Sequence, residues 1–350
     1  MSVIDTVRPD GRRGQLRRLN SLLGRRPGAL APPAYQGHQW PFLIAVIAVG
    51  CVLPLVFGGD TYHQTLLDQT LINSVLALGF YWCFSLAGQF TFAVFAIYAT
   101  GSYVSVWGAN HLGGFWSGLL LAMIVTGAIG GLTRLVFLRL APIFFAIATM
   151  AVGSLILILF RQWTSFTGGY NGVSTIPVPS LFGMQLHSLG RMYFLMLGVL
   201  ALFLAATVAF QRSPAMRDLV LSRDHGPVAA VAGLKPRHLT LVAFMVGSAM
   251  QGAAGSLYAH SSGFFSLESF SIDISLSVLL MVLLGGMDSI YGPVIGAALV
   301  VYIPELLRGV QNYSDLFYGV LVLLIVVAFP SGVAGIRGVA GRWVKRARSR

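Results

Sequence analysis

The sequence predicts an all-α integral membrane protein with about ten transmembrane helices, in a range of about eight to ten. Of the 350 residues, 56% are hydrophobic and only 10% are charged, whereas soluble domains carry roughly 25% charged residues. The mean hydropathy is +0.78, and the apolar segments approach the ~20 residues that cross a bilayer. The 41 glycines suit helices that pack closely in lipid.

Ten apolar segments along the chain predict the transmembrane helices. The first follows a basic stretch, as in a secretory signal, but Gly58-Gly59-Asp60 lacks the usual form of a cleavage site. We therefore interpret it as a retained first span. The eighth and ninth segments are short, so they are either two tilted helices or one re-entrant pair. The segments are 41–57, 69–87, 91–108, 116–138, 142–160, 191–210, 239–259, 270–286, 292–307 and 315–329.

The distribution of basic residues predicts the orientation. The net charge is +12, but the basic residues gather in the two tails and in one long connection, which argues against a nucleic-acid partner. With the N-terminus inside and an even number of crossings, 20 of the 23 Lys and Arg residues lie on the cytoplasmic side, as the positive-inside rule expects. The predicted organisation is a basic cytoplasmic tail (1–40), a transmembrane domain (41–335) and a second basic cytoplasmic tail (336–350), with both termini inside.

The predicted cytoplasmic connection, 211–238, has the signals of two consecutive helices. Ser213-Pro214 is typical of an N-cap followed by a first-turn proline, and the helix that it starts ends near Asp224. Gly226-Pro227 breaks this helix. A second helix of one to two turns follows and closes at Gly233.

The motifs of common catalytic and energy-converting sites are missing from the sequence. It contains no Gly-x-x-x-x-Gly-Lys-Ser/Thr phosphate loop, no Gly-x-Ser-x-Gly, no His-Glu-x-x-His and no Cys-x-x-Cys. We therefore predict that the chain is not an enzyme and has no catalytic residues, no metal and no cofactor of its own. No carboxylate is predicted at the membrane midplane, since Asp288 lies in the turn between the eighth and ninth segments. Proton-coupled carriers commonly bury such a carboxylate.

Neutral polar residues inside the apolar segments are candidates for lining a passage. In hydrocarbon such a side chain must find a partner, so it faces another helix or a water-filled path. Both interpretations stay open at this point: hydrogen bonding between helices, or a passage for a small polar solute. The candidates for the translocation path are Asn73, Gln89, Thr91 and Gln251.

Small residues at four-residue spacing predict close contacts between helices. Such contacts form because backbones approach where no large side chain intervenes. The sets are Gly127 with Gly131, Gly292 with Gly296, and Ser248 with Gly252 and Ser256.

Four stretches, taken in this order, resemble one known family. They are similar to the membrane subunits of the branched-chain amino-acid type of ABC importer, over roughly residues 66–335. Three positions depart from the family pattern, because Ala93, Ala99 and Asp288 stand where glycine is usual. The stretches are LAGQFT (Leu86–Thr91), WTSFTGGYNG (Trp163–Gly172) in the predicted external loop 161–190, the cytoplasmic segment Ser213–Gly233, and LLGGMDSIYGPVIGA (Leu283–Ala297).

This resemblance implies an ABC importer permease fold and a role as the membrane-spanning subunit that provides the path for a small polar solute. Branched-chain or other amino acids are the first expectation, and urea, short amides or aromatic acids are alternatives within the family. A sugar or nucleoside permease of the same superfamily, a secondary transporter and a membrane enzyme such as an acyltransferase are further alternatives.

The resemblance also implies partners and a location. The partners are a second membrane permease subunit, two cytoplasmic ATPase subunits that carry ATP and Mg²⁺, an external solute-binding protein, and the lipid of the bacterial cytoplasmic (inner) membrane. The residues expected to couple to the ATPase are Arg223, Asp224, Gly226, Pro227, Ala229, Ala230 and Gly233. The residues expected to form the external loop motif are Thr167, Gly168, Gly169, Asn171 and Gly172.

Overall fold

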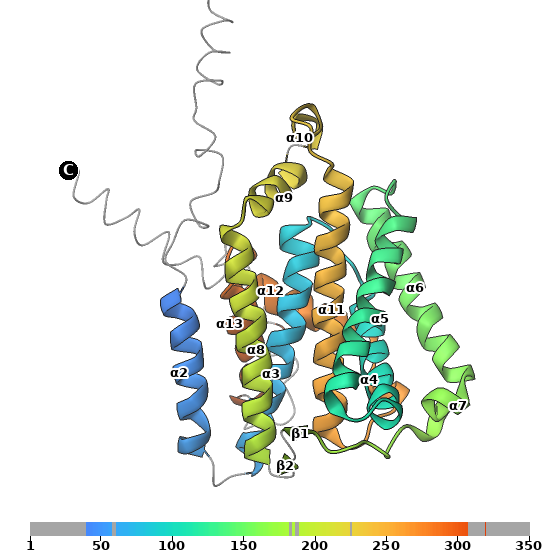
Figure 1. Ribbon diagram of the computed structural model, residues 1–350, viewed down its shortest axis with the longest axis vertical. Coiled ribbons are helices and arrows are strands. Elements are labelled where there is room, and N and C mark those ends of the chain that lie inside the picture. The colour runs from blue at the N-terminus through green and yellow to red at the C-terminus, as the bar shows by residue number, and fades with distance from the viewer. Residues whose placement is uncertain are drawn as a thin grey trace, which may run out of the picture. The chain divides into compact units, whose positions relative to one another are not determined.

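The computed structural model describes residues 40–57, 61–181, 184–185, 189–224, 226–306 and 319. Over these residues the chain is a bundle of helices, as the sequence predicts (Figure 1). The predicted tenth segment, 315–329, lies outside the described residues apart from position 319, and both basic tails lie outside them almost entirely.

Nine of the ten predicted segments coincide with helices, and short elements fill the connections. The long helices are α2 (Trp40–Phe57), α3 (Thr61–Tyr81), α4 (Val94–His111), α5 (Phe115–Val136), α6 (Pro142–Gln162), α8 (Leu189–Arg212), α11 (Pro236–Ser262), α12 (Ile272–Gly285) and α13 (Gly292–Leu306). The shorter elements are the π-helical turn η3 (Trp82–Leu86), α7 (Thr164–Thr167), η4 (Gly169–Asn171), β1 (Ser180–Leu181), β2 (Met184–Gln185), α9 (Pro214–Asp224), α10 (Gly226–Val231) and η5 (Leu267–Ser269).

Six helices among the described residues are long and apolar enough to cross a membrane, so the protein is a multi-pass membrane protein. Two shorter apolar helices, Pro41–Pro54 and Gly292–Leu306, accompany them. The count of ten crossings stays a prediction. The six spans are Thr61–Leu86, Phe115–Val136, Pro142–Gln162, Gly190–Arg212, Pro236–Ser262 and Leu267–Gly285.

The predicted start of the second span, residue 69, is wrong by eight residues, since α3 begins at Thr61. Polar residues in the first two turns lower the hydropathy there and hid the helix start. The helix can form because its backbone hydrogen bonds are made within the helix and because neighbouring helices bury its inner face. The correction places Asp68 and Gln69 inside a membrane-spanning helix.

Helix α11 lies at the centre of the bundle and packs against α3, α4 and α5. A Cβ built on Gly79 of α3 would lie 2.6 Å from the Gly247 carbonyl oxygen of α11, so the two backbones touch. The hydroxyls of Ser105 and Ser256 are 2.6 Å apart across the α4–α11 contact. The predicted close contacts of the small residues on α11 are therefore confirmed.

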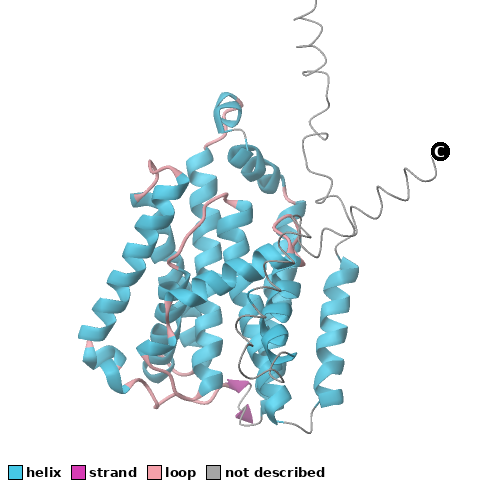
Figure 2. Ribbon diagram, turned by 180° about the vertical axis from the view of Figure 1, so that it is seen from behind, coloured by secondary structure: helices cyan, strands magenta, loops and turns pink. Residues whose placement is uncertain are grey.

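The ends of the bundle carry different elements. Figure 1 shows α9 and α10 at one end, and α7 with the β1–β2 pair at the opposite end; Figure 2 shows the same arrangement from behind. Along its outer side, α6 exposes large apolar residues such as Ile143, Phe144 and Leu155. This face suits lipid contact.

Candidate functional site: a membrane cavity and its link to the α9–α10 hairpin

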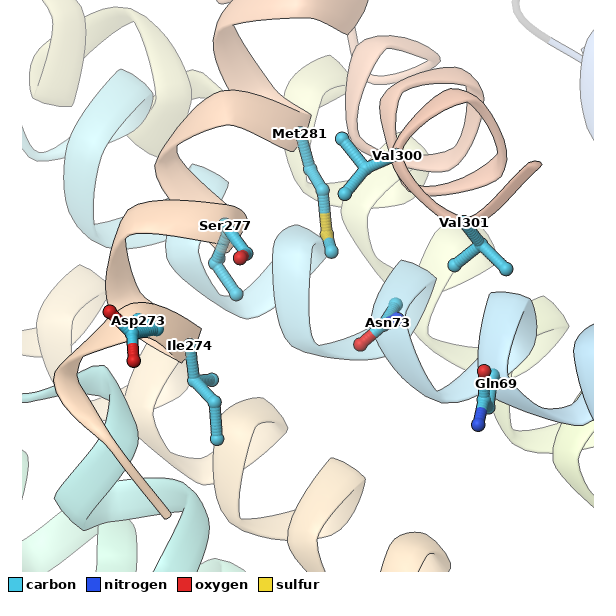
Figure 3. A pocket seen from close by; sticks show the side chains of 9 residues that line it. Gln69, Asn73, Asp273, Ile274, Ser277, Met281, Val300 and Val301 are labelled. Carbon is cyan, nitrogen blue, oxygen red and sulfur yellow. The ribbon is translucent and has the colours of Figure 1, made fainter. Parts of the chain in front are cut away.

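A cavity of about 380 Å³ lies between α3, α12 and α13 (Figure 3). Its volume falls within the range of about 300–1,000 Å³ that is usual for small-molecule sites. The lining combines one carboxylate, two amides and one hydroxyl with branched aliphatic side chains and a methionine. The lining residues are Gln69, Asn73, Asp273, Ile274, Ser277, Val278, Met281, Val300 and Val301.

Helices α12 and α13 form the hairpin that holds one wall of this cavity. A Cβ on Gly292 would approach the backbone of Gly285 and Gly286, and a Cβ on Gly296 would meet the Met281 carbonyl oxygen. Only glycine allows two helices to pack backbone against backbone in this way. The predicted Gly292–Gly296 contact is thereby confirmed, and its function is to set the spacing of the cavity wall.

The four residues predicted to line the path lie in different environments. Asn73 lines the cavity. The Gln251 side chain is fully buried in α11, where its amide nitrogen lies 3.8 Å from the Cys83 sulfur. The Thr91 hydroxyl is buried too and accepts a hydrogen bond from the Ala93 N–H (3.1 Å). Gln89 is half-buried in the connection between η3 and α4.

Residues 87–93, between η3 and α4, form a non-helical break inside the bundle. Their backbone groups bond to side chains from other helices. The Phe92 N–H donates to the Thr149 hydroxyl of α6 (3.1 Å), and the Phe92 carbonyl accepts from the Ser275 hydroxyl of α12 (2.8 Å). Ser275 also accepts from the Phe95 N–H (3.1 Å). Irregular backbone is tolerated at membrane depth only where such partners satisfy it.

Helices α9 and α10 form a hairpin at one end of the bundle, which we call the α9–α10 hairpin, and the prediction of two consecutive helices is confirmed. Its closing glycine, Gly233, has φ +80°, and its N–H donates to the Ala230 carbonyl (3.1 Å). Ser213 was predicted to cap the start of α9. Its hydroxyl instead donates to the Phe210 carbonyl at the end of α8 (2.6 Å).

Short helix α10 presents apolar side chains to solvent. Val231 is 92% exposed and Val228 is 58% exposed, whereas Ala229 is buried. Pro227 and Ala230 are exposed beside them, and Asp224 is exposed at the end of α9. The tip of the hairpin therefore carries a small apolar surface made of short side chains.

Arg223, at the end of α9, points back to the membrane domain. Its guanidinium donates to the Ser85 carbonyl at the end of η3 and, through Nε, to the Asp224 carboxylate (2.7 Å). Carbonyls at a helix end lack intrahelical partners, and the partial negative charge there favours a cation. A Cβ on Gly88, which has φ +68°, would lie 2.5 Å from the Arg223 Cγ. The side chain thus joins the α9–α10 hairpin to the break.

The motif Thr167–Gly172, predicted to lie in the external loop, forms a turn with a defined backbone conformation. All three of its glycines have positive φ: Gly168 (+71°), Gly169 (+60°) and Gly172 (+70°). The Thr167 hydroxyl donates to the Phe160 carbonyl (2.6 Å) and accepts from the Gly169 N–H (3.1 Å).

This turn is attached to the segment that precedes α12. The N–H groups and carbonyls of Val173 and Phe265 pair with each other at 2.9 and 3.3 Å. Asn171 is exposed beside this pair. The motif therefore gives the loop one backbone conformation and leaves Asn171 available at the surface.

Sequence reasoning missed three acidic or amide residues, Asp68, Gln69 and Asp273. Asp68 is only 6% exposed inside α3, and its Oδ1 has no hydrogen-bond partner among the residues that the structure describes. Asp68 is therefore a buried carboxylate in the second turn of the span Thr61–Leu86, and the expectation that no carboxylate lies at the membrane midplane stays a prediction. All three residues lie within four residues of a predicted segment boundary. Near such a boundary, the average hydropathy of the segment does not show whether a polar residue lies at a helix end in water or in a helical turn inside the bundle.

Comparison with known proteins assigns the family. Residues 62–328 match the family described as branched-chain amino acid transport system / permease component. The chain belongs to this family. The permease is 31% identical to the high-affinity branched-chain amino acid transport system permease protein LivM of Escherichia coli, over 86% of this chain and 77% of the relative.

Two further relatives extend the likeness. The permease is 26% identical to LivH of Escherichia coli, over 81% of this chain and 95% of the relative. It is 25% identical to a probable LivM of Methanocaldococcus jannaschii, over 67% of this chain and 73% of the relative. No solved structure matches the permease.

Proposed function

We propose that the chain is the membrane-spanning permease subunit of an ATP-driven ABC importer and that the cavity between α3, α12 and α13 belongs to the path of a branched-chain or related amino acid. The observation that carries this proposal is the position of polar side chains on membrane-spanning helices. Gln69 and Asp273 are exposed on two of the six spans and both line the cavity.

A charged side chain on a spanning helix faces water or another protein, because exposure to lipid costs several kcal/mol. The α3–α12–α13 face is therefore unsuited to lipid, in contrast to the apolar outer face of α6. We assign this face to the second permease subunit, so that the path runs between the two subunits. The named relatives include two kinds of permease protein, LivM and LivH, and this favours a non-identical partner.

The orientation follows from the same proposal. The N-terminus, the α9–α10 hairpin and the C-terminus lie in the cytoplasm of a cell whose inner membrane holds the protein, and the 161–190 loop lies outside. The 20-of-23 distribution of basic residues supports this orientation. The hairpin and the external loop also lie at opposite ends of the bundle (Figure 1).

The hairpin is assigned as the contact with the ATPase subunits, which bind ATP and Mg²⁺. The short side chains of α10 can enter a groove, and exposed Val228 and Val231 gain by burial there. Arg223 then transmits movement of the hairpin to Ser85 and Gly88 at the break. From the break, the Phe92–Ser275 bonds lead to α12 and the cavity wall.

The test is reconstitution of the permease with its partner permease and ATPase subunits in proteoliposomes, with the solute-binding protein added outside. We expect ATP-dependent accumulation of leucine by the full complex, and neither ATP hydrolysis nor accumulation by this chain alone. Uphill uptake by the isolated chain under a proton or sodium gradient would overturn the importer assignment. Uptake of urea, amides or aromatic acids without leucine would overturn the solute assignment.

A further inference from the structure

The cavity holds its charged and amide groups apart from one another. Asp273 lies near the start of α12, whereas Gln69 and Asn73 lie on α3. Figure 3 shows Asp273 at one side of the lining and Gln69 at the other, with Asn73 and Ser277 between them. The carboxylate and the Gln69 amide thus lie on opposite sides of the space, and the Asn73 amide lies between them.

One oxygen of Asp273 has a fixed partner. The Ser271 hydroxyl donates to Asp273 Oδ2 at 2.9 Å. An acidic residue in the first turn also stabilises the helix start, and this accounts for the residue type at position 273. Stabilisation of the helix start does not explain why the Asp273 side chain is exposed toward the cavity. Its helix, α12, belongs to a candidate membrane span. The bond from Ser271 holds the carboxylate in place and leaves Oδ1 for a second donor.

The remaining lining is aliphatic. Val300 and Val301 of α13 and Met281 of α12 present branched or flexible apolar side chains, and Ile274 lies beside Asp273. Such a surface contributes hydrophobic contact and selects by volume.

We propose that this cavity recognises a zwitterionic aliphatic amino acid, and the inference rests on the proposed function. The Asp273 carboxylate accepts hydrogen bonds from the α-ammonium group. The side-chain amides of Gln69 and Asn73 donate to the α-carboxylate. The valines of α13 and Met281 contact the aliphatic side chain.

The arrangement discriminates between classes of solute. An acid without an ammonium group brings a second negative charge to Asp273, and like charges repel. An amine without a carboxylate leaves the amides of Gln69 and Asn73 without their partner. Urea offers neither a charge for Asp273 nor a side chain for the aliphatic wall. The permease then adds a selection step to that of the solute-binding protein.

The test measures protection of a cysteine in the cavity, which detects weak binding. The permease carries Cys51→Ser, Cys83→Ala and Ser277→Cys, and is assembled into the full complex in nanodiscs without the binding protein. A water-soluble thiol reagent labels Cys at position 277, and the labelling rate is measured with leucine, 3-methylbutylamine or 4-methylpentanoate. We expect labelling, and protection by leucine at concentrations at least roughly tenfold below those at which either analogue protects.

Two variants complete the test. Asp273→Asn keeps the shape of the side chain but removes the charge, and we expect it to raise the half-protecting leucine concentration by roughly tenfold to a hundredfold. Asp288→Asn removes one charge from the turn after α12, outside the lining, and we expect no change. Equal protection by 4-methylpentanoate, no protection by leucine up to its solubility limit, or an unchanged Asp273→Asn variant would overturn the inference.

ATP-dependent uptake by the unmodified complex is measured in parallel. Uptake of leucine without protection would overturn the inference and leave the proposed function standing. Failure of the complex to take up any amino acid would overturn the proposed function.

Discussion

Replacement of Gly88 by alanine tests whether Arg223 links the α9–α10 hairpin to the break. Gly88 has φ +68°, and a residue with a Cβ pays roughly 1–2 kcal/mol in this conformation. The added Cβ would also lie 2.5 Å from the Arg223 Cγ and 3.0 Å from its Cδ, so the side chain of Arg223 must move. Its hydrogen bond to the Ser85 carbonyl is then lost.

A second glycine serves as a matched control for the conformational strain that alanine brings to a position with positive φ. Gly263, after α11, has φ +67°, and a Cβ there would meet nothing within 4 Å. Gly263→Ala therefore carries the same conformational strain without displacing a neighbour. The difference between the two variants isolates the contact with Arg223. A hydrogen bond from a charged group contributes about 1.5–3 kcal/mol, which corresponds to roughly a tenfold to hundredfold effect.

The assay is the amount of solute moved per ATP hydrolysed in proteoliposomes that contain the full complex, normalised to assembled permease. We expect Gly88→Ala to lower this ratio at least roughly tenfold, while Gly263→Ala stays within about twofold. Arg223→Met, which keeps the apolar stem and removes the donors, should match Gly88→Ala. If Gly88→Ala and Gly263→Ala behave alike, Arg223 does not carry the coupling.

Three further predictions concern packing, the ATPase contact and orientation. Gly252→Ala places a methyl against the Thr126 side chain and should destabilise the detergent-solubilised protein by about 1–3 kcal/mol. Gly198→Ala, where the added methyl meets nothing within 4 Å, should leave the stability unchanged. Thermal unfolding of the two variants measures the difference. Ala230→Arg should abolish copurification of the ATPase or its stimulation by loaded binding protein; normal values for both would exclude α10 as the contact. In intact cells, an impermeant thiol reagent should label cysteine at position 171 and not at position 230, and the reverse result would invert the predicted orientation.

The sequence sufficed to predict the helices because lipid imposes a simple requirement on them. A segment near 20 apolar residues long must form a helix, since water is not present to satisfy its backbone. The α9–α10 hairpin was equally predictable, because Pro214, Pro227 and Gly233 have fixed conformational preferences. Both kinds of signal depend on a few adjacent residues.

The cavity was less predictable because an apolar helix does not reveal which side faces the protein. Gln251 and Asn73 were both candidates for the path, yet Gln251 packs against Cys83 in the core while Asn73 lines the cavity. The direction of a side chain depends on the neighbouring helices, which are distant in the sequence. For Asp273 and Gln69 there is a second reason. Each lies at the edge of a predicted segment, so the sequence did not identify it as part of the cavity.

The distribution of close contacts indicates where the bundle can move. Helix α11 touches α3, α4 and α5 through glycine and serine, so a shift there would force backbones into each other. The break at residues 87–93 is attached differently, because the hydroxyls of Thr149 and Ser275 hold its Phe92. Hydroxyls rotate and can follow a displaced backbone group. We therefore expect movement of the hairpin to reach α12 and the cavity through the break, while α11 keeps its place in the bundle.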